Sequence, residues 1–305
     1  MHGACLPPSF ETTAERPSQD EVSEYSRLLR RDEVAMAPVP LIELTNVTKS
    51  FDDGRTHALH DVSLRIEAGG FIALVGTSGS GKTTAMKMIN RLLDPDRGQV
   101  RFEGLAVESL DAPTLRRGIG YVFQGIGLFP HMTIGENIGI TPQLLGWPKP
   151  DIEARVMELL DLVELPRSYA TRFPHALSGG QRQRAGVARA IAARPRVMLM
   201  DEPFGALDPI TRDALGTAYR ALHDRLAMTT VMVTHDVQEA VLLADRIVVM
   251  SAGRIVADDT PGALLAGHAS AEVSALMAMP RRQAERIGML LEASGNRFPR
   301  PTPHG

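Results

Sequence analysis

The segment GTSGSGKTT, residues 76–84, combines closely spaced glycines with a lysine and three threonines. It matches the pattern G-x-x-x-x-G-K-[ST], in which glycines let successive backbone N–H groups turn toward phosphate oxygens. A helix that begins at such a loop adds the partial positive charge of its N-terminus, while Lys82 reaches the terminal phosphates and the Thr83 hydroxyl binds Mg²⁺. The predicted phosphate site consists of Gly76, Thr77, Ser78, Gly79, Ser80, Gly81, Lys82, Thr83 and Thr84. This pattern indicates a nucleotide without naming the reaction, because kinases, GTPases and many ATPases share it.

Two acidic residues, Asp201 and Glu202, end the apolar segment VMLMDE. Ligands of parallel sheets bind at the carboxyl ends of the strands, which is where this pair is predicted to lie. We expect Asp201 to hold Mg²⁺ through water and Glu202 to polarise the attacking water as a general base. Such a pair can also simply cap a helix, but the phosphate loop favours the catalytic interpretation.

A second glycine-containing segment, LSGGQ, follows the phosphate loop by about a hundred residues. Small residues and glycines followed by the start of a helix let the backbone approach an anion. Ser178 is also a good helix N-cap, and the two roles are compatible. The segment consists of Leu177, Ser178, Gly179, Gly180 and Gln181. The chain therefore carries two phosphate-facing segments that are far apart.

The elements that must position these residues are short apolar strands and amphipathic helices. The predicted strands are LIELTNVTKSF, DVSLRI, FIALVG, QVRFEG, IGYVFQ, RVMLMDE, TTVMVTH and RIVVM. Helical spacing places two sets of apolar side chains on one face each. The two sets are Val156, Leu159, Leu160 and Val163, and Leu215, Tyr219, Leu222 and Leu226. The alternation predicts an α/β fold with a mixed sheet core, an antiparallel β layer and an α-helical subdomain inserted at about 125–193.

Composition excludes several classes of protein. The 305 residues are 44% hydrophobic, and the net charge of −3 argues against binding to nucleic acid or to an anionic membrane surface. A single cysteine, Cys5, excludes an intrachain disulfide framework and a cysteine-rich zinc site. No stretch approaches the ~18–20 apolar residues that span a bilayer, and the N-terminus does not have the pattern of a secretory signal.

Taken together and in this order, the motifs resemble those of the nucleotide-binding subunits of ABC transporters, the ATP-binding cassette ATPases, over about 41–260. LSGGQ is the signature of that family. Gln124 in YVFQ is similar to its Q-loop, Asp208 in GALD to its D-loop, and His235 in VTHD to its switch histidine. Phe51 stands where the family places an aromatic residue that stacks on adenine, although many members have tyrosine there. A lone histidine after an apolar strand is usually only a surface residue, so the neighbouring motifs carry the assignment of His235.

The resemblance implies a P-loop NTPase fold of the ABC type, ATP and Mg²⁺ as ligands, and a head-to-tail homodimer. In the family, the signature of one subunit faces the γ-phosphate held by the phosphate loop of the other. Ser178, Gly179 and Gly180 would then donate to the γ-phosphate of the partner's ATP. Gln124 would reach Mg²⁺ and the attacking water and contact a membrane partner.

Several finer stretches are similar to the cassettes of osmoprotectant importers, which take up glycine betaine, choline or carnitine. These stretches are MKMINRLLDPDRG, LRRGIGYVFQGIGLFPHMTIGENI, QLLGWPK and DEPFGALDPITRD. Gly125 departs from the glutamine of several relatives, which weakens the inference of the solute but not of hydrolysis. Phe129, Pro130 and Met132 lie where the family seats a coupling helix of the membrane subunit, or they belong to the core.

The implied assembly contains two transmembrane permease subunits and, indirectly, an extracytoplasmic substrate-binding protein, with this chain peripheral on the cytoplasmic face of the membrane. Alternatives are a cassette for another small solute, such as an amino acid, a polyamine or a sulfonate, and a non-transport cassette. The single cassette and the absence of sustained heptads disfavour the last.

We expect three regions along the chain: a disordered extension at 1–39, the ATPase domain at 40–265 and a short tail at 266–305 that is loose after Pro280. Met36 is the expected native start. Some osmoprotectant cassettes carry a tandem pair of CBS modules after the ATPase domain and use them to sense ionic strength. The 45 residues after Thr260 are too few for such a pair, which would need roughly a hundred or more.

Overall fold

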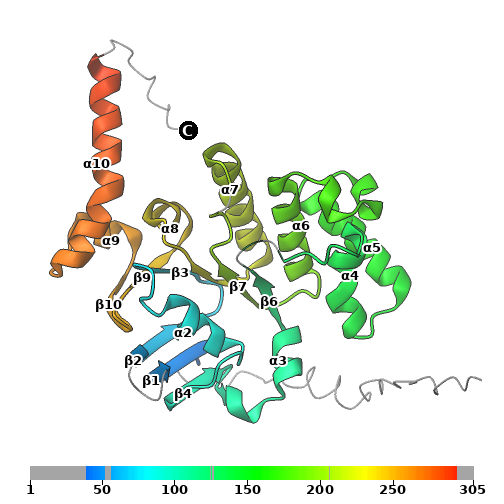
Figure 1. Cartoon of the computed structure of the whole chain (residues 1–305), viewed down its shortest axis with the longest axis horizontal. Helices are drawn as coiled ribbons and strands as arrows, with labels where there is room; N and C mark the ends of the chain where they lie inside the picture. The colour runs from blue at the N-terminus through cyan, green and yellow to red at the C-terminus, as the bar shows by residue number, and fades with distance from the viewer. Residues whose placement is uncertain (1–38, 52–55, 124, 126, 206, 294–305) are drawn as a thin grey trace, which may run out of the picture.

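The computed structural model describes residues 39–51, 56–123, 125, 127–205 and 207–293. Met36 and Gln124 lie outside these residues, and so does all but the last residue of the predicted extension at 1–39. Figure 1 shows two sheets at the centre, with helices α4 to α6 to one side and helix α10 rising at the other.

A six-stranded sheet with the order β10-β9-β3-β8-β7-β6 forms the centre of the structure. Its strands are β3 (Phe71–Val75), β6 (Ile119–Val122), β7 (Val197–Asp201), β8 (Thr229–Val233), β9 (Arg246–Ser251) and β10 (Arg254–Asp259). All neighbours pair in parallel except β10, which runs antiparallel to β9 at the edge. Every residue of β3, β7 and β8 is buried, as expected for strands covered on both faces.

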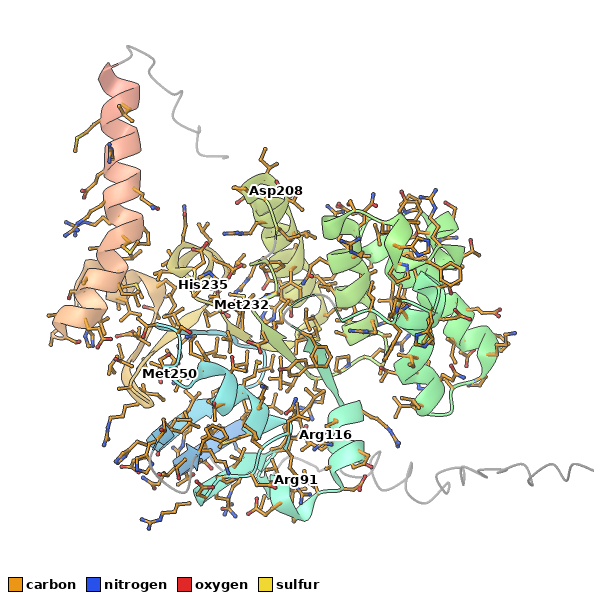
Figure 2. All side chains as sticks on the ribbon, in the orientation of Figure 1. Arg91, Arg116, Asp208, Met232, His235 and Met250 are labelled. Atoms are coloured by element: carbon orange, nitrogen blue, oxygen red, sulfur yellow. The ribbon has the colours of Figure 1, made fainter. Side chains whose placement is uncertain are left out.

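The second sheet is antiparallel and has the order β2-β1-β4-β5. Its strands are β1 (Ile42–Phe51), β2 (Thr56–Ile66), β4 (Arg97–Phe102) and β5 (Leu105–Ala106). Helix α2 (Lys82–Ile89) shares one hydrophobic core with both sheets through Met86, Met88 and Ile89. The central sheet therefore has a core on each face, with Met250 in this one and Met232 in the other (Figure 2).

The chain between β6 and β7 is helical. It contains α4 (Ile134–Leu144), α5 (Lys149–Leu162), the short 3-10 turns Arg167–Thr171 and Pro174–Ala176, and α6 (Gly179–Ile191). The predicted stripe of Val156, Leu159, Leu160 and Val163 is buried against the core. The predicted fold class is confirmed: an antiparallel layer, a mixed sheet and a helical insertion.

Two short elements connect β5 to β6, a 3-10 turn at Val107–Ser109 and helix α3 (Ala112–Arg117). Arginine side chains fasten this connection to the end of α2, because Arg91 donates to the Leu110 carbonyl and Arg116 to the carbonyls of Asn90 and Arg91. Figure 2 shows Arg91 and Arg116 on adjacent elements.

The C-terminal helices are α7 (Pro209–Leu226), α8 (Val237–Leu243), α9 (Pro261–Ala266) and α10 (Ala271–Ala293). Two predictions for this region are wrong. Leu226 does not belong to the buried stripe of α7, since it is the last helical residue, is 41% exposed and precedes the left-handed Ala227. The chain after Pro280 is not loose but continues α10 to Ala293, because strong helix formers follow the proline.

A buried polar group, His223 of α7, lies at the opposite end of β8 from the candidate site. Its Nδ1 is 3.0 Å from the Thr230 hydroxyl, which also contacts the Tyr219 hydroxyl at 2.9 Å. The His223 ring packs beside Phe71 with 5.2 Å between ring centroids. Burial lowers the pKa of His223, because a charged imidazolium is poorly solvated there.

We therefore expect the free energy of unfolding to decrease as the pH falls below about 6.5, the ordinary histidine pKa, because the unfolded chain then binds a proton that folded His223 resists. A His223→Gln variant should show a smaller decrease in its urea midpoint between pH 7.5 and 5.5 than the unmodified chain. The matched control is His175→Gln at an exposed position, which should leave the decrease unchanged. Equal slopes for all three proteins would contradict the prediction.

Candidate active site

The phosphate loop, residues 76–81, connects the end of β3 to the start of α2. Gly76 and Gly81 have φ angles of +148° and +100°, and a Cβ atom at either would lie within 2.1 Å and 2.3 Å of the Met250 and Ala58 carbonyl oxygens. Positive φ and the close approach of another backbone both require glycine at these two positions. The two glycines thus let the loop fold closely around the N-terminus of α2, where an anion is favoured.

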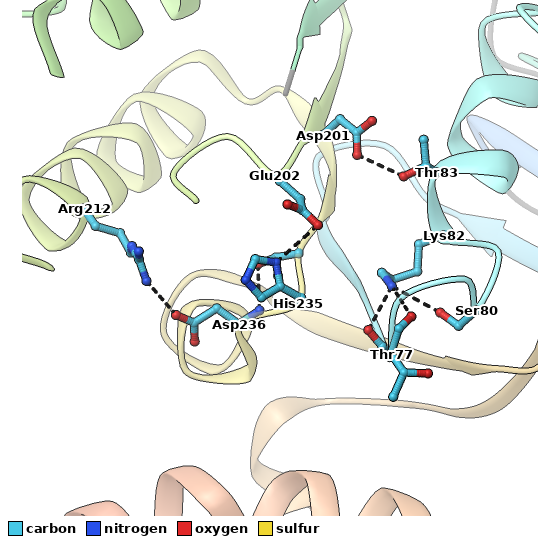
Figure 3. A network of polar contacts seen from close by, with 11 residues as sticks. Thr77, Ser80, Lys82, Thr83, Asp201, Glu202, Arg212, His235 and Asp236 are labelled. Atoms are coloured by element: carbon cyan, nitrogen blue, oxygen red, sulfur yellow. Dashed lines mark hydrogen bonds and ion pairs between the residues drawn. The ribbon is translucent and has the colours of Figure 1, made fainter. Parts of the chain in front are cut away.

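Lys82 points back into this loop (Figure 3). Its Nζ donates to the carbonyl oxygens of Gly76 and Thr77, both at 2.8 Å, and to the Ser80 hydroxyl at 3.2 Å. Burial lowers the pKa of Lys82, while the nearby Glu202 and Asp201 carboxylates oppose that effect. A cation held by neutral oxygens at the centre of a loop can exchange these contacts for phosphate oxygens.

Thr83 and Asp201 bring a hydroxyl and a carboxylate together from α2 and the end of β7. Thr83 Oγ1 donates to Asp201 Oδ1 at 3.1 Å, and Asp201 is buried. Burial raises the pKa of Asp201, so a nearby cation would stabilise its charged form. Hard oxygen ligands of this kind suit Mg²⁺, which also takes ligands from phosphates. Within the described ranges, no group of three or more His, Cys, Asp or Glu side chains could hold a metal.

Glu202 and His235 face each other across the neighbouring strand ends (Figure 3). The distance between His235 Nδ1 and Glu202 Oε1 is 3.2 Å. Glu202 follows β7 with a φ of +46°, and its N–H donates to the Val233 carbonyl at the end of β8. The left-handed conformation turns the carboxylate out of the sheet ladder while its backbone remains paired, which places it at the carboxyl edge of the sheet.

Lys82, Thr83, Glu202 and His235 line one polar cavity of about 580 Å³, and Asp201 is hydrogen-bonded to Thr83 of this lining. Its lining consists of Ala58, Ser78, Gly79, Gly81, Lys82, Thr83, Thr84, Glu202 and His235. An ammonium, a hydroxyl–carboxylate pair and a helix N-terminus are the donor set that a magnesium-bound triphosphate needs, so the residues present fit that ligand. The cavity is also large enough for several phosphate groups.

The signature segment lies elsewhere, at the start of α6. Ser178 Oγ accepts from the Gln181 N–H at 3.3 Å, and Gln181 Oε1 accepts from the Ser178 N–H at 3.0 Å, which forms a capping box. Leu177 is buried, whereas a Cβ atom at Gly179 would meet nothing within 4 Å. None of Leu177 to Gln181 lines the cavity of its own chain as described.

The remaining predicted residues are placed as follows. Phe51 ends β1 and is 43% exposed, so its ring is available for stacking. Asp208 caps α7 by accepting from the Thr211 N–H at 3.0 Å, and hydrogen bonds from the Thr211 hydroxyl and from this N–H lower the pKa of Asp208. Gln124 lies outside the described residues, and Gly125 beside it has a φ of +90°. Phe129 is exposed and Met132 is half-buried, so neither belongs to the buried core.

Comparison with known proteins identifies the family. The family model described as "ABC transporter" matches residues 59–205. The glycine betaine uptake system ATP-binding protein YehX of Escherichia coli is 48% identical over 225 residues, which cover 74% of this chain and 72% of that protein. The chain belongs to the ABC transporter ATP-binding family.

Other members of this ABC family support the same assignment. The choline transport ATP-binding protein OpuBA of Bacillus subtilis is 52% identical over 225 residues, covering 74% of this chain and 59% of that protein. A dimeric structure of the ATP-binding cassette MJ0796 in a post-hydrolysis state, bound to ADP and Pi, is 34% identical with a TM-score of 0.66 and covers 72% of this chain and 98% of that one. The chain spans about three-fifths of the length of the first curated relatives it matches. In the described part of this cassette, no helix combines the length and the apolar character needed to cross a bilayer.

Sequence reasoning about the cassette missed three polar residues beside His235. Asp236 caps α8, Arg212 of α7 pairs with Asp236, and Glu239 is buried in the first turn of α8. Aspartate before a helix is a signal for an N-cap, so Asp236 could have been found. Arg212 and Glu239 look like ordinary charged positions of amphipathic helices, and only the folded contacts reveal them.

Glu239 provides a test of this region through its titration. Burial raises the pKa of Glu239 to about 7, with the Asp236 carboxylate adding to that effect and Thr234, Arg212 and His235 opposing it. Between about pH 4.5 and 7 the unfolded chain loses this proton while the folded chain keeps it, so Glu239 lowers stability progressively as pH rises through that window. We compare the free energy of unfolding of Glu239→Gln with that of the unmodified chain. This difference should be about 2 kcal/mol more favourable to the variant at pH 8 than at pH 5.

Urea unfolding of both proteins at the two pH values measures this difference. A Glu153→Gln variant, at an exposed position on α5, is the matched control and should show none. An unchanged or negative difference for Glu239→Gln would mean that Glu239 is already ionised in the fold at pH 5.

Proposed function

We propose that this chain is the ATP-binding and ATP-hydrolysing subunit that energises an importer for osmoprotectant quaternary amines such as glycine betaine, choline and carnitine. The observation that carries the proposal is the convergence of Lys82, Thr83 and the Glu202–His235 pair on one cavity, with Asp201 hydrogen-bonded to Thr83. The names of relatives at about 50% identity support the solute class.

Each group has a defined task in hydrolysis. Lys82 and the N-terminus of α2 neutralise the β- and γ-phosphates. Thr83 and Asp201 would hold Mg²⁺, which would offset negative charge on the phosphates. Glu202 accepts a proton from the attacking water while the water oxygen forms a bond to the γ-phosphorus. The bond between the γ-phosphorus and the oxygen of the leaving ADP breaks. His235, which already contacts Glu202, reaches the γ-phosphate and orients both groups.

A second copy of the chain completes each site. Ser178, Gly179 and Gly180 of the partner donate to the γ-phosphate, and Asp208 lies at the same interface. Phe51 of the chain whose phosphate loop holds the ATP stacks on the adenine. A homodimer with twofold symmetry is the economical assembly, because each chain has one of each half-site. The dimeric state of the cassette MJ0796 supports this arrangement.

Binding of two MgATP closes the homodimer, and the segment around Gln124 carries the closure to two transmembrane permease subunits. The permeases then accept the solute from an extracytoplasmic substrate-binding protein, and hydrolysis reopens the dimer. The chain works at the cytoplasmic face of the membrane as a peripheral subunit. It has one ATPase domain at 40–265 and a short C-terminal tail at 266–305.

The test is uptake of labelled glycine betaine, choline and carnitine at high salt in a strain that lacks this gene. The strain is complemented with the unmodified chain, with Glu202→Gln, or with Glu153→Gln as a matched surface control. Uptake restored by the unmodified chain and the control, but not by Glu202→Gln, is the expected result. If none of the three is taken up, the solute belongs to another class, and the permease that co-purifies with the chain would be identified next.

A further inference from the structure

One arginine, Arg212 in the first turn of α7, bridges two loops that the proposed mechanism treats separately. Its Nη1 donates to Asp236 Oδ2 at 3.0 Å, and its Nη2 donates to the Leu207 carbonyl at 3.1 Å. The third nitrogen, Nε, is buried and has no hydrogen-bond partner among the residues that the structure describes. The planar guanidinium is therefore fixed by two contacts in different directions, which a lysine could not reproduce.

On one side of this bridge is the loop that carries His235 (Figure 3). Asp236 Oδ1 accepts from the N–H groups of Gln238 and Glu239 at 2.9 and 3.2 Å, so one carboxylate oxygen caps α8 and the other binds Arg212. Because Asp236 follows His235 directly, its position sets that of the peptide holding the imidazole. The imidazole in turn lies 3.2 Å from Glu202.

On the other side is the segment that reaches the partner. Leu207 is buried, and the next residue, Asp208, is exposed at the outer end of α7 (Figure 2). The same turn of α7 touches the signature helix, because a Cβ atom at Gly180 would lie 2.7 Å from Thr211 Cγ2. The first turn of α7 thus contacts the signature helix, the Leu207 carbonyl and the loop that carries His235.

We propose that Arg212 is a positioning residue that links Leu207 and Asp208 to His235, so that contact of the partner subunit with Asp208 holds the imidazole in its place against Glu202 during hydrolysis. The inference rests on the proposed function. It assigns Arg212 to the timing of hydrolysis and not to nucleotide binding, because no atom of Arg212 lines the cavity described above.

The chain contains a matched control on the same helix. Arg220 of α7 donates to the Leu243 carbonyl at 2.8 Å and pairs with Asp245 at 2.8 Å, so it also joins α7 to a carbonyl and an aspartate. These contacts lie at and just after the C-terminal end of α8, away from His235. An arginine bridge that only holds helices together should behave alike at the two positions.

The experiment compares Arg212→Met, Arg212→Lys, Asp236→Asn, the Arg212→Met/Asp236→Asn double variant and Arg220→Met in the full chain. Asp236→Asn retains the oxygen that caps α8 but replaces the oxygen that accepts from Arg212 with an amide donor. Steady-state ATPase rates give kcat and KM, and thermal unfolding gives Tm. These readouts separate loss of position from loss of stability.

We expect kcat to decrease about tenfold in Arg212→Met and in Asp236→Asn, with KM for MgATP unchanged within about twofold. The double variant should lose no more than either single variant, because one link is broken in all three. Arg212→Lys should recover part of kcat, and Arg220→Met should retain kcat while its Tm decreases.

Equal kcat for Arg212→Met and Arg220→Met, or additive losses in the double variant, would overturn the inference and leave a structural ion pair. If Arg212→Met does not fold, Asp236→Asn and Arg212→Lys decide between the two outcomes. Absence of ATP hydrolysis in the unmodified chain would instead count against the proposed function, so the two failures are distinguishable.

Discussion

A Glu202→Gln variant should lose steady-state ATP hydrolysis by about 10²–10⁴-fold while still binding MgATP, because a general base contributes that much to such a reaction. Glutamine retains the size of the side chain and can still contact His235, which lies 3.2 Å away, but it cannot accept the proton of the attacking water. With hydrolysis blocked, two copies should remain closed on their ATP. Phosphate release measures the rate, and size-exclusion chromatography with MgATP measures the dimer.

The control for this variant is Glu153→Gln, which removes one carboxylate from the exposed face of α5. It should keep the normal rate and show no ATP-dependent dimer that outlasts hydrolysis. Normal turnover in Glu202→Gln would contradict the assignment of the base. Loss of turnover without a stable dimer would support the base but contradict closure of two copies around ATP.

The parallel strands of the central sheet could be predicted from the sequence, because burial on both faces leaves short uninterrupted apolar segments such as FIALV and VMLMD. The antiparallel edge strand β10 was not predicted, since its sequence RIVADD is half polar. The phosphate loop could be predicted for a similar reason: Gly76 and Gly81 occupy positions where a Cβ atom would collide with a neighbouring backbone. In both cases the physical requirement falls on residues that are adjacent in the chain.

Contacts between distant elements could not be predicted in the same way. Arg212 and Asp236 are 24 positions apart, and although Asp236 has the sequence signal of a helix N-cap, nothing in the sequence predicts that Arg212 pairs with it. The buried state of Glu239 depends on the same packing. Leu226 shows the opposite error, because its spacing fits the apolar stripe of α7 but the helix ends there and leaves the side chain exposed.

The other large expected effect concerns the composite sites. Lys82→Ala should lose tight ATP binding, because it removes the ammonium at the centre of the phosphate loop. Ser178→Arg should abolish hydrolysis by placing a long cation where the signature must approach the γ-phosphate of the partner. A 1:1 mixture of these two inactive proteins should recover about a quarter of the normal ATPase rate, since random pairing gives half mixed dimers with one intact site of two.

The pairing of variants provides its own control. A mixture of Lys82→Ala with Glu202→Gln should recover no activity. Both changes damage the half of the site that holds ATP, so both sites of a mixed dimer are inactive. Ser178→Arg mixed with Glu202→Gln before ATP is added should also recover activity, because the mixed dimer again contains one intact site. Ser178 also caps α6, so a Tm measurement must show that Ser178→Arg is folded.

If all three mixtures remain inactive while mixed dimers form, the signature segment does not act across the interface. Recovery restricted to the two mixtures that contain Ser178→Arg can arise only if each ATP is held by one chain and contacted by the signature of the other.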